Sequence, residues 1–293
     1  MSLNAKINKI AKATGRPAQQ VHREFYLQRF LGRVFADPDS PWVLKGGTGL
    51  LVRMDGARYS RDADLLRTDV EAAAATDDLQ RLCDQPTTLD PFTFQIQRSP
   101  KDPGVGEAAQ LEALVYYGAM QMQKFPIDLS IRTTLAAEID YVVPRPVLDL
   151  TEEVLGELPR FRCLSLADQV SDKVSAMYEV HGINATPSTR WHDLVDLLLI
   201  ITRFSLSAAK TALALQIQQQ RRRERLTLPA AIGSPGPQWE HSYPTEAAAS
   251  SLPQHLHRLD TALAALGACL DPLLDGSRQR GQWDPGTQQW TDR

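Results

Sequence analysis

One residue separates Asp62 from Asp64, and on an extended chain this spacing points both carboxylates to the same side. Neighbouring carboxylates repel each other and raise each other's pKa unless a cation lies between them. Oxygen ligands of this kind suit Mg²⁺, which substrate phosphates also hold. The pair therefore predicts a binding site for Mg²⁺, with Mn²⁺ as the alternative ion.

An anion site is predicted just upstream of the two aspartates. Gly46-Gly47 is followed by Thr48 at the expected start of a helix, so Thr48 is expected to cap that helix. Backbone N–H groups at such a turn can face an anion, and Lys45 before the turn is a further expected nucleotide contact. A phosphate site beside a metal site is what nucleotidyl transfer requires. The alternative is an ordinary turn beside two solvated aspartates.

Ser60 lies two residues before Asp62, so its hydroxyl is expected on the side of the metal ligands, within reach of a bound triphosphate. A phosphate group on Ser60 would add about two negative charges and would compete with the nucleotide. We hypothesise that Ser60 is a point at which a partner silences the protein. The alternative is a serine that only stabilises its turn.

Asp128 interrupts the apolar segment 125–131, which is expected to be a strand. A carboxylate at this position is either an exposed residue on an alternating strand or a third ligand of the metal ion. We predict that Asp128 is a ligand.

Two blocks of the sequence resemble a known family. The first, residues 42–66, holds Gly-Gly-Thr followed by Asp-x-Asp, the signature of minimal nucleotidyltransferases; its Lys-Gly-Gly-Thr opening and Ser60-Arg61 are similar to the AbiEii toxin family, which includes the mycobacterial MenT toxins. The second, residues 164–200, resembles the same family. It contains Leu-Ala-Asp-Gln-Val-Ser-Asp-Lys ending at Lys173, and then Arg-Trp-His-Asp-Leu-Val-Asp-Leu from Arg190.

The resemblance implies roles for two residues of the second block. Lys173 resembles a lysine that contacts the triphosphate, and Asp193 resembles a carboxylate that orients this lysine or the metal site. A buried lysine needs an anionic partner, whereas a lysine on the surface would pair with Asp172 or Glu179. Position 192 departs from the family pattern, because it is His where the family usually has Lys or Arg.

The resemblance also implies an activity. It describes a cytoplasmic toxin that uses Mg²⁺ to transfer nucleotides from an NTP to the 3′ acceptor end of tRNA, which blocks translation, and whose protein partner is a cognate antitoxin. A second reading keeps the chemistry and changes the acceptor to a protein or a small molecule. A third is a degenerate, non-catalytic module that only binds a nucleotide or a partner; the intact Asp62-Ala-Asp64 argues against it.

A short basic run is the predicted RNA-binding surface. It consists of Arg221, Arg222, Arg223 and Arg225. As phosphate contacts these residues would make RNA binding sensitive to salt. The alternative is that they only close a helix, because cations at a helix C-terminus are favourable by the helix dipole alone.

Bulk composition excludes several classes of protein. The 293 residues are 43% hydrophobic and 23% charged, with a net charge of −3, so any nucleic-acid surface must be a local patch. Three widely spaced cysteines exclude a disulfide framework or a zinc cluster and are expected to be reduced and mostly buried. The N-terminal segment lacks the apolar core of a signal peptide. No stretch of about 18 apolar residues occurs, so no membrane partner is expected.

The elements that must position these residues follow from hydrophobic periodicity. Strands are expected over residues 62–66, 92–96, 111–117 and 125–131. Helices are expected over 4–35 with a break near residues 15–17, and over 70–82, 166–178, 189–204, 206–225 and 245–274, the last interrupted near Pro253.

Two further segments lack regular periodicity. Residues 229–244 hold four prolines and predict a long loop, in which Trp239 and Tyr243 either stack on RNA bases or pin the loop to the core. Residues 275–293 predict a loosely held tail.

These elements predict an α+β fold, with a nucleotidyltransferase-type mixed sheet lobe followed by a mainly helical C-terminal lobe. The first lobe is expected over residues 1–150 and carries the metal site. The second is expected over residues 151–293 and contributes Lys173, Asp193 and the RNA surface.

Overall fold

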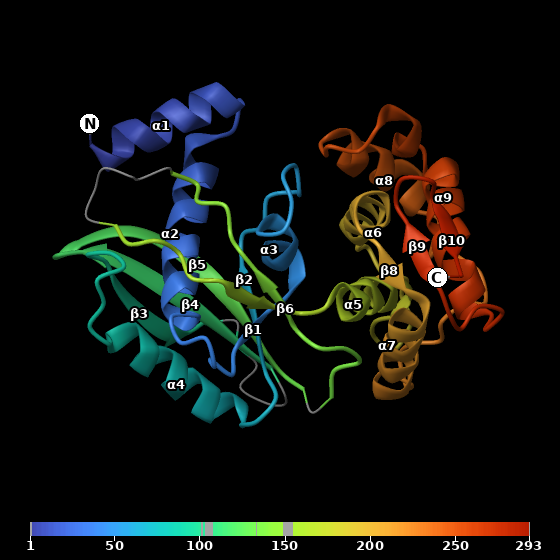
Figure 1. Cartoon of the computed structure of the whole chain (residues 1–293), viewed down its shortest axis with the longest axis horizontal. Helices are drawn as coiled ribbons and strands as arrows, with labels where there is room; N and C mark the ends of the chain where they lie inside the picture. Colours follow the sequence, from blue (N-terminus) through green and yellow to red (C-terminus); the bar gives the residue numbers. More distant parts are fainter. Residues whose placement is uncertain (1, 101, 103–107, 133, 149–154, 293) are drawn as a thin grey trace. The chain divides into compact units, whose positions relative to one another are not determined.

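The computed structural model describes residues 2–100, 102, 108–132, 134–148 and 155–292. Contacts between residues divide the chain into two compact units (Figure 1). The first comprises residues 1–55, 59–134 and 139–163, and the second comprises residues 56–58, 135–138 and 164–293. The mixed α and β architecture confirms the predicted fold class.

The first unit is built on a seven-stranded mixed sheet. The strand order is β3-β4-β5-β2-β1-β7-β6. β2 pairs with β5 and β1 pairs with β7 in parallel, and the other neighbours are antiparallel. The strands are β1 (Val43–Leu44), β2 (Ala63–Arg67), β3 (Thr93–Arg98), β4 (Ala108–Tyr117), β5 (Met120–Ile131), β6 (Asp140–Val142) and β7 (Phe161–Cys163). The pairing of β7 with β1 carries this unit past residue 150, where the first lobe was expected to end.

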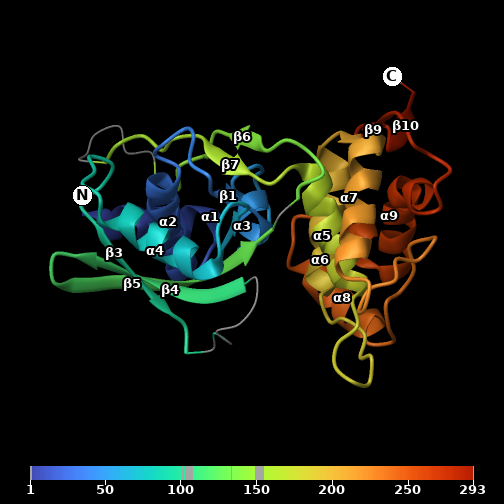
Figure 2. The ribbon, with the colours of Figure 1, turned by 90° about the horizontal axis from the view of Figure 1, so that it is seen from below.

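Helices cover one side of this sheet. They are α2 (Ala18–Val34) and α4 (Ala72–Asp84); α1 (Leu3–Thr14) packs against α2, and the short α3 (Gly46–Leu51) follows β1. The predicted break between the first two helices is confirmed, because Gly15 ends α1 with φ +66° in the left-handed region and Pro17 precedes α2. Figure 2 shows α2 and α4 on the same side of β3, β4 and β5.

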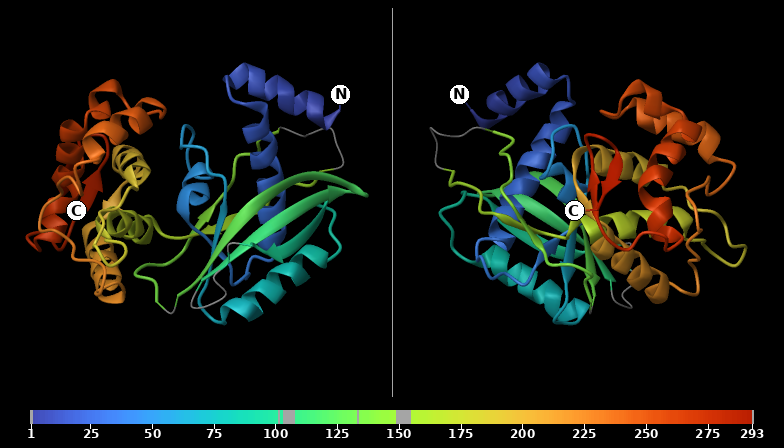
Figure 3. Two further views of the ribbon diagram at one scale, coloured as in Figure 1. Left: turned by 180° about the vertical axis from the view of Figure 1, so that it is seen from behind. Right: turned by 45° about the vertical axis from the view of Figure 1, so that its right-hand side comes forward.

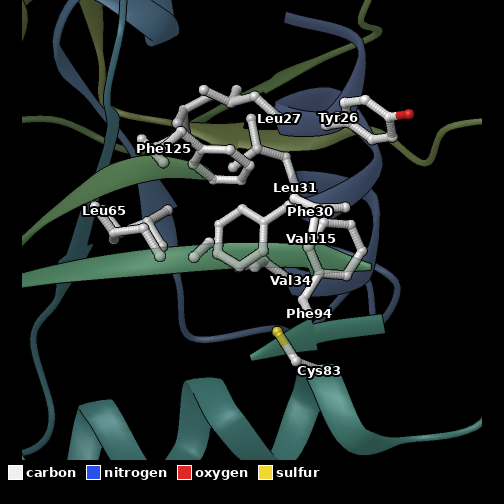
Figure 4. Packing of buried hydrophobic residues seen from close by; sticks show 14 of the residues in the cluster. Tyr26, Leu27, Phe30, Leu31, Val34, Leu65, Cys83, Phe94, Val115 and Phe125 are labelled. Carbon is white, nitrogen blue, oxygen red and sulfur yellow. The ribbon is translucent and has the colours of Figure 1, made fainter. Parts of the chain in front are cut away.

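The core of the first unit lies between α2, α4 and the sheet. Phe30 on α2 meets Phe94 on β3 and Phe125 on β5, with ring centroids 5.8 and 5.5 Å apart (Figure 4). β4 and β5 form the long hairpin drawn in green in Figure 3, and their alternating apolar residues face this core. The opposite face of β2 and β5 is thereby left for polar side chains.

The second unit is mainly helical. Its helices are α5 (Leu166–Tyr178), α6 (Trp191–Arg203), α7 (Ala208–Arg221), α8 (Trp239–Ala248) and α9 (Leu259–Leu274), with a 3₁₀ turn η1 (Gln254–His257). α5 has its predicted bounds, because Ser165 caps it by accepting from the backbone N–H of Asp168. α6 is apolar almost all round and is buried along most of its length.

The predicted loop over residues 229–244 is wrong in its second half, because α8 begins at Trp239. The indole N–H of Trp239 donates to the Ser188 carbonyl at 2.8 Å, and the hydroxyl of Tyr243 donates to the Leu256 carbonyl at 2.6 Å. Both side chains are buried. Their burial outweighs the helix-breaking signal of the prolines, and it contradicts a stacking role on RNA.

The predicted loose tail is also wrong. β9 (Gln282–Asp284) pairs with β10 (Gln289–Thr291) and with β8 (Leu206–Ser207) to form a three-stranded sheet, and both tail strands are labelled in Figure 1. Trp283 is buried and donates to the Ile201 carbonyl at 2.7 Å, and Trp290 donates to the Cys269 carbonyl at 2.9 Å. Two tryptophans therefore anchor a tail whose other residues are polar.

The expectation for the cysteines is confirmed, since Cys83, Cys163 and Cys269 are free thiols and all are buried. Over the part of the chain that the structure describes, each helix is too short or too polar to cross a membrane.

Candidate active site

The β1–α3–β2 segment contains the turn for which an anion site is predicted. The backbone N–H of Lys45 donates to the Asp64 carbonyl at 2.9 Å, which joins the end of β1 to β2. Gly46 starts α3 with φ +64°, a conformation that favours glycine. A Cβ atom added to Gly46 would lie 2.0 Å from Oδ2 of Asp64. Glycine is therefore required here both by the backbone and by the closeness of the aspartate.

Thr48 does not cap α3 as predicted. The N-cap is Lys45, without a side-chain cap bond, and Thr48 lies inside the helix. Its hydroxyl donates to the backbone carbonyl of Asp62 at 2.6 Å. Ser60 donates to the same carbonyl at 3.4 Å and is 7% exposed. Two hydroxyls therefore hold the backbone carbonyl of Asp62 in place, just before β2 begins.

Three aspartates gather at the start of β2 and on β5. Asp64 is the register partner of Asp128 in the parallel pair β2–β5, so their side chains lie on the same face. Ala63, Leu65, Ile127 and Leu129 on these strands are buried on the core side, whereas both aspartates are only partly buried. Asp128 therefore lies on the non-core face of an alternating strand, as the first alternative proposed. It also lies beside Asp64, as a role as third metal ligand requires.

The electrostatics of Asp62 shows that the three carboxylates interact. Burial raises the pKa of Asp62, and the charges of Asp128 and Asp64 raise it further, to about 6. Arg61 and Arg23 act in the opposite direction. Lys45 lies close by, with its Nζ 3.9 Å from Oδ1 of Asp64. The site thus combines three repelling carboxylates with a rim of cations.

The donor chemistry of these carboxylates fits a hard divalent cation. Carboxylate oxygens are the ligands that Mg²⁺ prefers, and a cation between them would cancel the repulsion that raises the pKa of Asp62. The side chains are not already drawn into a closed cluster: among the described residues, no three His, Cys, Asp or Glu side chains have the spacing to hold an ion together. Binding would therefore require the three carboxylates to close in.

Lys173 and Asp193, the two residues assigned by resemblance, lie in the second unit and contact each other. Nζ of Lys173 donates to Oδ1 of Asp193 at 3.0 Å and to Oδ2 of Asp196 at 2.5 Å. The side chain of Lys173 is 6% exposed. Burial by itself would lower its pKa, but Asp193 and Asp196 outweigh burial and raise it. The alternative of a surface lysine paired with Asp172 or Glu179 is therefore wrong.

Arg190 supplies Asp193 with the positive charge that a lysine or arginine at position 192 would have provided. Burial lowers the pKa of His192 to about 4, despite the opposing effect of Asp193, so the imidazole is neutral near pH 7. Nε of Arg190 donates to Oδ2 of Asp193 at 2.6 Å. Burial alone would raise the pKa of Asp193, but Lys173 and Arg190 outweigh it and the pKa is lowered. Asp193 is therefore a permanent carboxylate.

The predicted RNA surface is partly used within the fold. Arg222 donates to Glu179 at 2.7 Å and to Gln218 at 3.1 Å, and Nε of Arg225 lies 3.4 Å from the carboxylate of Glu179. Arg221 and Arg223 are exposed at the end of α7. The run does close a helix, as the alternative held, and Arg222 helps to fix that helix end to α5.

Sequence reasoning missed three residues of these two groups. Arg23 on α2 affects Asp62 and bonds to Tyr59, and nothing in the sequence links it to the motif. Arg58 donates to Asp196. It was overlooked although it lies close to the motif, four residues before Asp62. Asp196 was detectable, because the spacing of three residues places it on the same helix face as Asp193.

Comparisons with known proteins agree with these features. The family model described as "Nucleotidyl transferase AbiEii toxin, Type IV TA system" matches residues 29–265. Among solved structures, MenT4, a nucleotidyltransferase toxin from Mycobacterium tuberculosis, is similar in fold: the TM-score is 0.57 at 17% identity, over 92% of this chain and 88% of that one. JHP933 from Helicobacter pylori matches at a TM-score of 0.46 and 15% identity, over 88% and 93% of the chains.

No curated protein matches the sequence closely enough to count as a relative. The family model nevertheless covers most of the chain and spans both motif blocks, from before Lys45 to beyond Asp196. The chain therefore belongs to the AbiEii family of nucleotidyltransferase toxins of type IV toxin–antitoxin systems.

Proposed function

We propose that this toxin transfers nucleotides from an NTP to the 3′ acceptor end of tRNA, and that this modification blocks translation in the cytoplasm. Mg²⁺ is the proposed cofactor, with Mn²⁺ as its substitute, and a cognate antitoxin protein is the proposed partner. The observation that carries the proposal is the position of Asp62 beside Asp64 and Asp128: burial and the charges of these two carboxylates together raise the pKa of Asp62 to about 6. A divalent cation bound by these carboxylates would offset their mutual repulsion.

Asp62, Asp64 and Asp128 would hold the ion, which when bound neutralises charge on the nucleotide phosphates. The turn at Gly46-Gly47 would offer backbone N–H groups to the phosphates, and Nζ of Lys45 lies 3.9 Å from Oδ1 of Asp64. Thr48 keeps the backbone of Asp62 in position, since its hydroxyl proton is donated to the Asp62 carbonyl.

Lys173 is the proposed contact of the triphosphate. An ammonium group has three N–H donors; Asp193 and Asp196 accept two of them, and the third can be donated to a phosphate oxygen. In the reaction, the 3′ hydroxyl oxygen of tRNA bonds to the α-phosphorus, the bond from that phosphorus to the pyrophosphate breaks, and the hydroxyl proton passes to solvent. Asp193 keeps the lysine charged throughout.

The test is incubation of the purified protein with total tRNA, Mg²⁺ and each α-labelled NTP in turn. We expect label in tRNA from at least one NTP, and no label with EDTA or with Asp62→Asn. Periodate oxidation destroys the terminal cis-diol of tRNA and should prevent labelling if the 3′ end is the acceptor. Label on a protein or a small molecule, with none on tRNA, would replace the proposed acceptor; absence of any transfer would leave a binding module.

Ser60 is proposed as the point of control. Its hydroxyl already faces the Asp62 carbonyl, so a phosphate group on Ser60 would lie beside the metal ligands and repel the triphosphate. Because Ser60 is 7% exposed, a modifying partner must first open this segment. Transfer assays on a stoichiometrically phosphorylated protein test the idea, and full activity would rule it out.

A further inference from the structure

Three residues of the chain between α3 and β2 pack with the second unit. Residues 56–58 belong to that unit although the residues on both sides belong to the first. The hydroxyl of Ser251 donates to the Gly56 carbonyl at 2.6 Å, and Nε of Arg58 donates to Oδ2 of Asp196 at 3.2 Å. Asp62 follows four residues after Arg58, so this anchored segment leads directly into the carboxylate site.

Arg58 is one end of a chain of alternating charges. Oδ2 of Asp196 accepts from both Arg58 and Lys173. Lys173 also donates to Asp193, and the other oxygen of Asp193 accepts from Arg190. Lys173 is therefore held by two carboxylates, and each of these also accepts from an arginine: Asp193 through its second oxygen, and Asp196 through the same oxygen that Lys173 uses.

Because the centre of this network is buried, the loss of any one of its ion pairs is expected to disturb the others. The side chains of Lys173, Asp193 and Asp196 are 6%, 0% and 1% exposed, whereas Arg58 and Arg190 are 26% and 51% exposed. Removing one partner of a buried ion pair leaves an uncompensated charge. Oδ1 of Asp196 is buried without a hydrogen-bond partner among the described residues, so Asp196 depends on Oδ2 for its hydrogen bonds.

We propose that Arg58 is a positioning residue for Lys173. Without Arg58, Asp196 has Lys173 as its remaining hydrogen-bond donor, and the amine is pulled toward it and away from the geometry that it holds between two carboxylates. Arg58 also fixes the chain four residues before Asp62. Arg58 thus belongs to the same buried ion network as Lys173, the proposed contact of the triphosphate. The inference rests on the proposed function, because it assigns Lys173 to the nucleotide.

The test compares three variants with the wild type. Arg58→Gln removes the charge, and we expect the rate of nucleotide transfer to fall by about 10- to 100-fold, which is the scale for a misplaced catalytic contact. Arg58→Lys retains the charge and should recover part of the rate. Ser251→Ala removes the other anchor of residues 56–58 without touching the ion network, so it should keep nearly the wild-type rate even if its melting temperature falls as far as that of Arg58→Gln.

A second measurement keeps the inference separate from the proposed function. Affinity for an NTP analogue with a non-cleavable α–β bond is measured on the same variants. A wild type that binds the analogue but transfers nothing would defeat the proposed function. The inference still requires that Arg58→Gln binds the analogue several-fold more weakly than Ser251→Ala does. Equal transfer and equal affinity in these two variants would overturn it, since Arg58 would then be an ordinary loop anchor.

Discussion

Gly46 and Asp64 stand so close that a methyl group on Gly46 would lie 2.0 Å from Oδ2 and 2.9 Å from Cβ of Asp64. The Cβ atom is not the free end of a flexible side chain, so Asp64 must move if residue 46 acquires a side chain. We expect Gly46→Ala to abolish nucleotide transfer and to lower the free energy of unfolding by more than the backbone conformation alone explains.

Gly118 provides the matched control. It also has a positive φ, +57°, but a Cβ atom there would meet nothing within 4 Å. Gly118→Ala should therefore cost only the left-handed backbone penalty of about 1–2 kcal/mol and should retain activity. If both variants lose the same free energy of unfolding and keep the same rate of transfer, the closeness of residue 46 to Asp64 matters neither for stability nor for activity.

Thr48→Val should damage the site more than Thr48→Ser. The valine removes the hydroxyl that donates to the Asp62 carbonyl at 2.6 Å, while Thr48 is 1% exposed, so we expect a loss of about 1–2 kcal/mol in the free energy of unfolding. Transfer should fall because the backbone of Asp62 is no longer fixed. Thr48→Ser keeps the hydroxyl and should stay near the wild-type rate; a Val variant as active as the Ser variant would contradict this role.

The local part of the site was predictable because its geometry depends on short stretches of chain. The two-residue period of a strand places Asp64 on the face away from the core, and the alternation of β5 leaves Asp128 on the same face. Asp62, which was predicted to start the strand, lies one residue before β2. The cap position was not predictable to the residue, because α3 starts at Gly46 and includes Thr48. Helix ends shift by one or two residues with small changes in hydrogen bonding.

Asp62→Asn should stabilise the protein in the absence of divalent cations. The pKa of Asp62 is raised from an ordinary 3.8 to about 6, so between these values the folded state binds more protons than the unfolded state, and wild-type stability falls as pH rises through this window. Asparagine cannot ionise. The melting temperature of the variant in EDTA should therefore exceed that of the wild type at pH 7.5, with the gap closing toward pH 4.

Mg²⁺ should then raise the melting temperature of the wild type more than that of Asp62→Asn, because binding to the folded state stabilises it. A variant less stable than the wild type at pH 7.5 in EDTA, or an equal response to Mg²⁺, would remove Asp62 from the proposed ligand set.

His192 should make the protein sensitive to acid. Burial depresses its pKa from 6.5 to about 4, so over this range the unfolded state binds more protons, and stability is lost as pH falls from about 6.5 toward 4. His192→Gln should show a shallower fall in the free energy of unfolding over this interval. Urea denaturation at half-unit steps of pH measures the difference, and an imidazole NMR signal titrating near pH 6.5 in the folded protein would be inconsistent with the prediction.

The distant parts of the structure could not be predicted because their partners come from tertiary packing. Arg58 contacts Asp196 across 138 residues of sequence, and no periodicity points from one to the other. The first part of α8, residues 239–244, was predicted as loop because of its flanking prolines, yet Trp239 and Tyr243 bury their rings and stabilise the helix. The polar tail was predicted as loose, yet Trp283 and Trp290 anchor it to the helices of the second unit. In each case burial decided the outcome against local propensity.

The residues of the basic run at the end of α7 allow a role in RNA binding to be tested separately from a role in folding. Arg222 is bound to Glu179, so its reversal to Glu would place like charges together and destabilise the fold. Arg223 is exposed, and Arg223→Glu should leave the melting temperature unchanged. If the run contacts tRNA, this variant should bind tRNA more weakly at low salt, and the slope of log K against log[salt] should fall by about 1.

Lys210→Glu is the control for that experiment, because Lys210 is exposed near the other end of the same helix and its reversal changes the net charge of the protein by the same amount. A contact between Arg223 and a phosphate group acts at short range, because salt screens exposed charges beyond about 10 Å. Arg223→Glu should therefore reduce the slope more than Lys210→Glu does. If both variants reduce it equally, tRNA responds only to the overall charge of the protein, and Arg223 belongs to an ordinary solvated helix end.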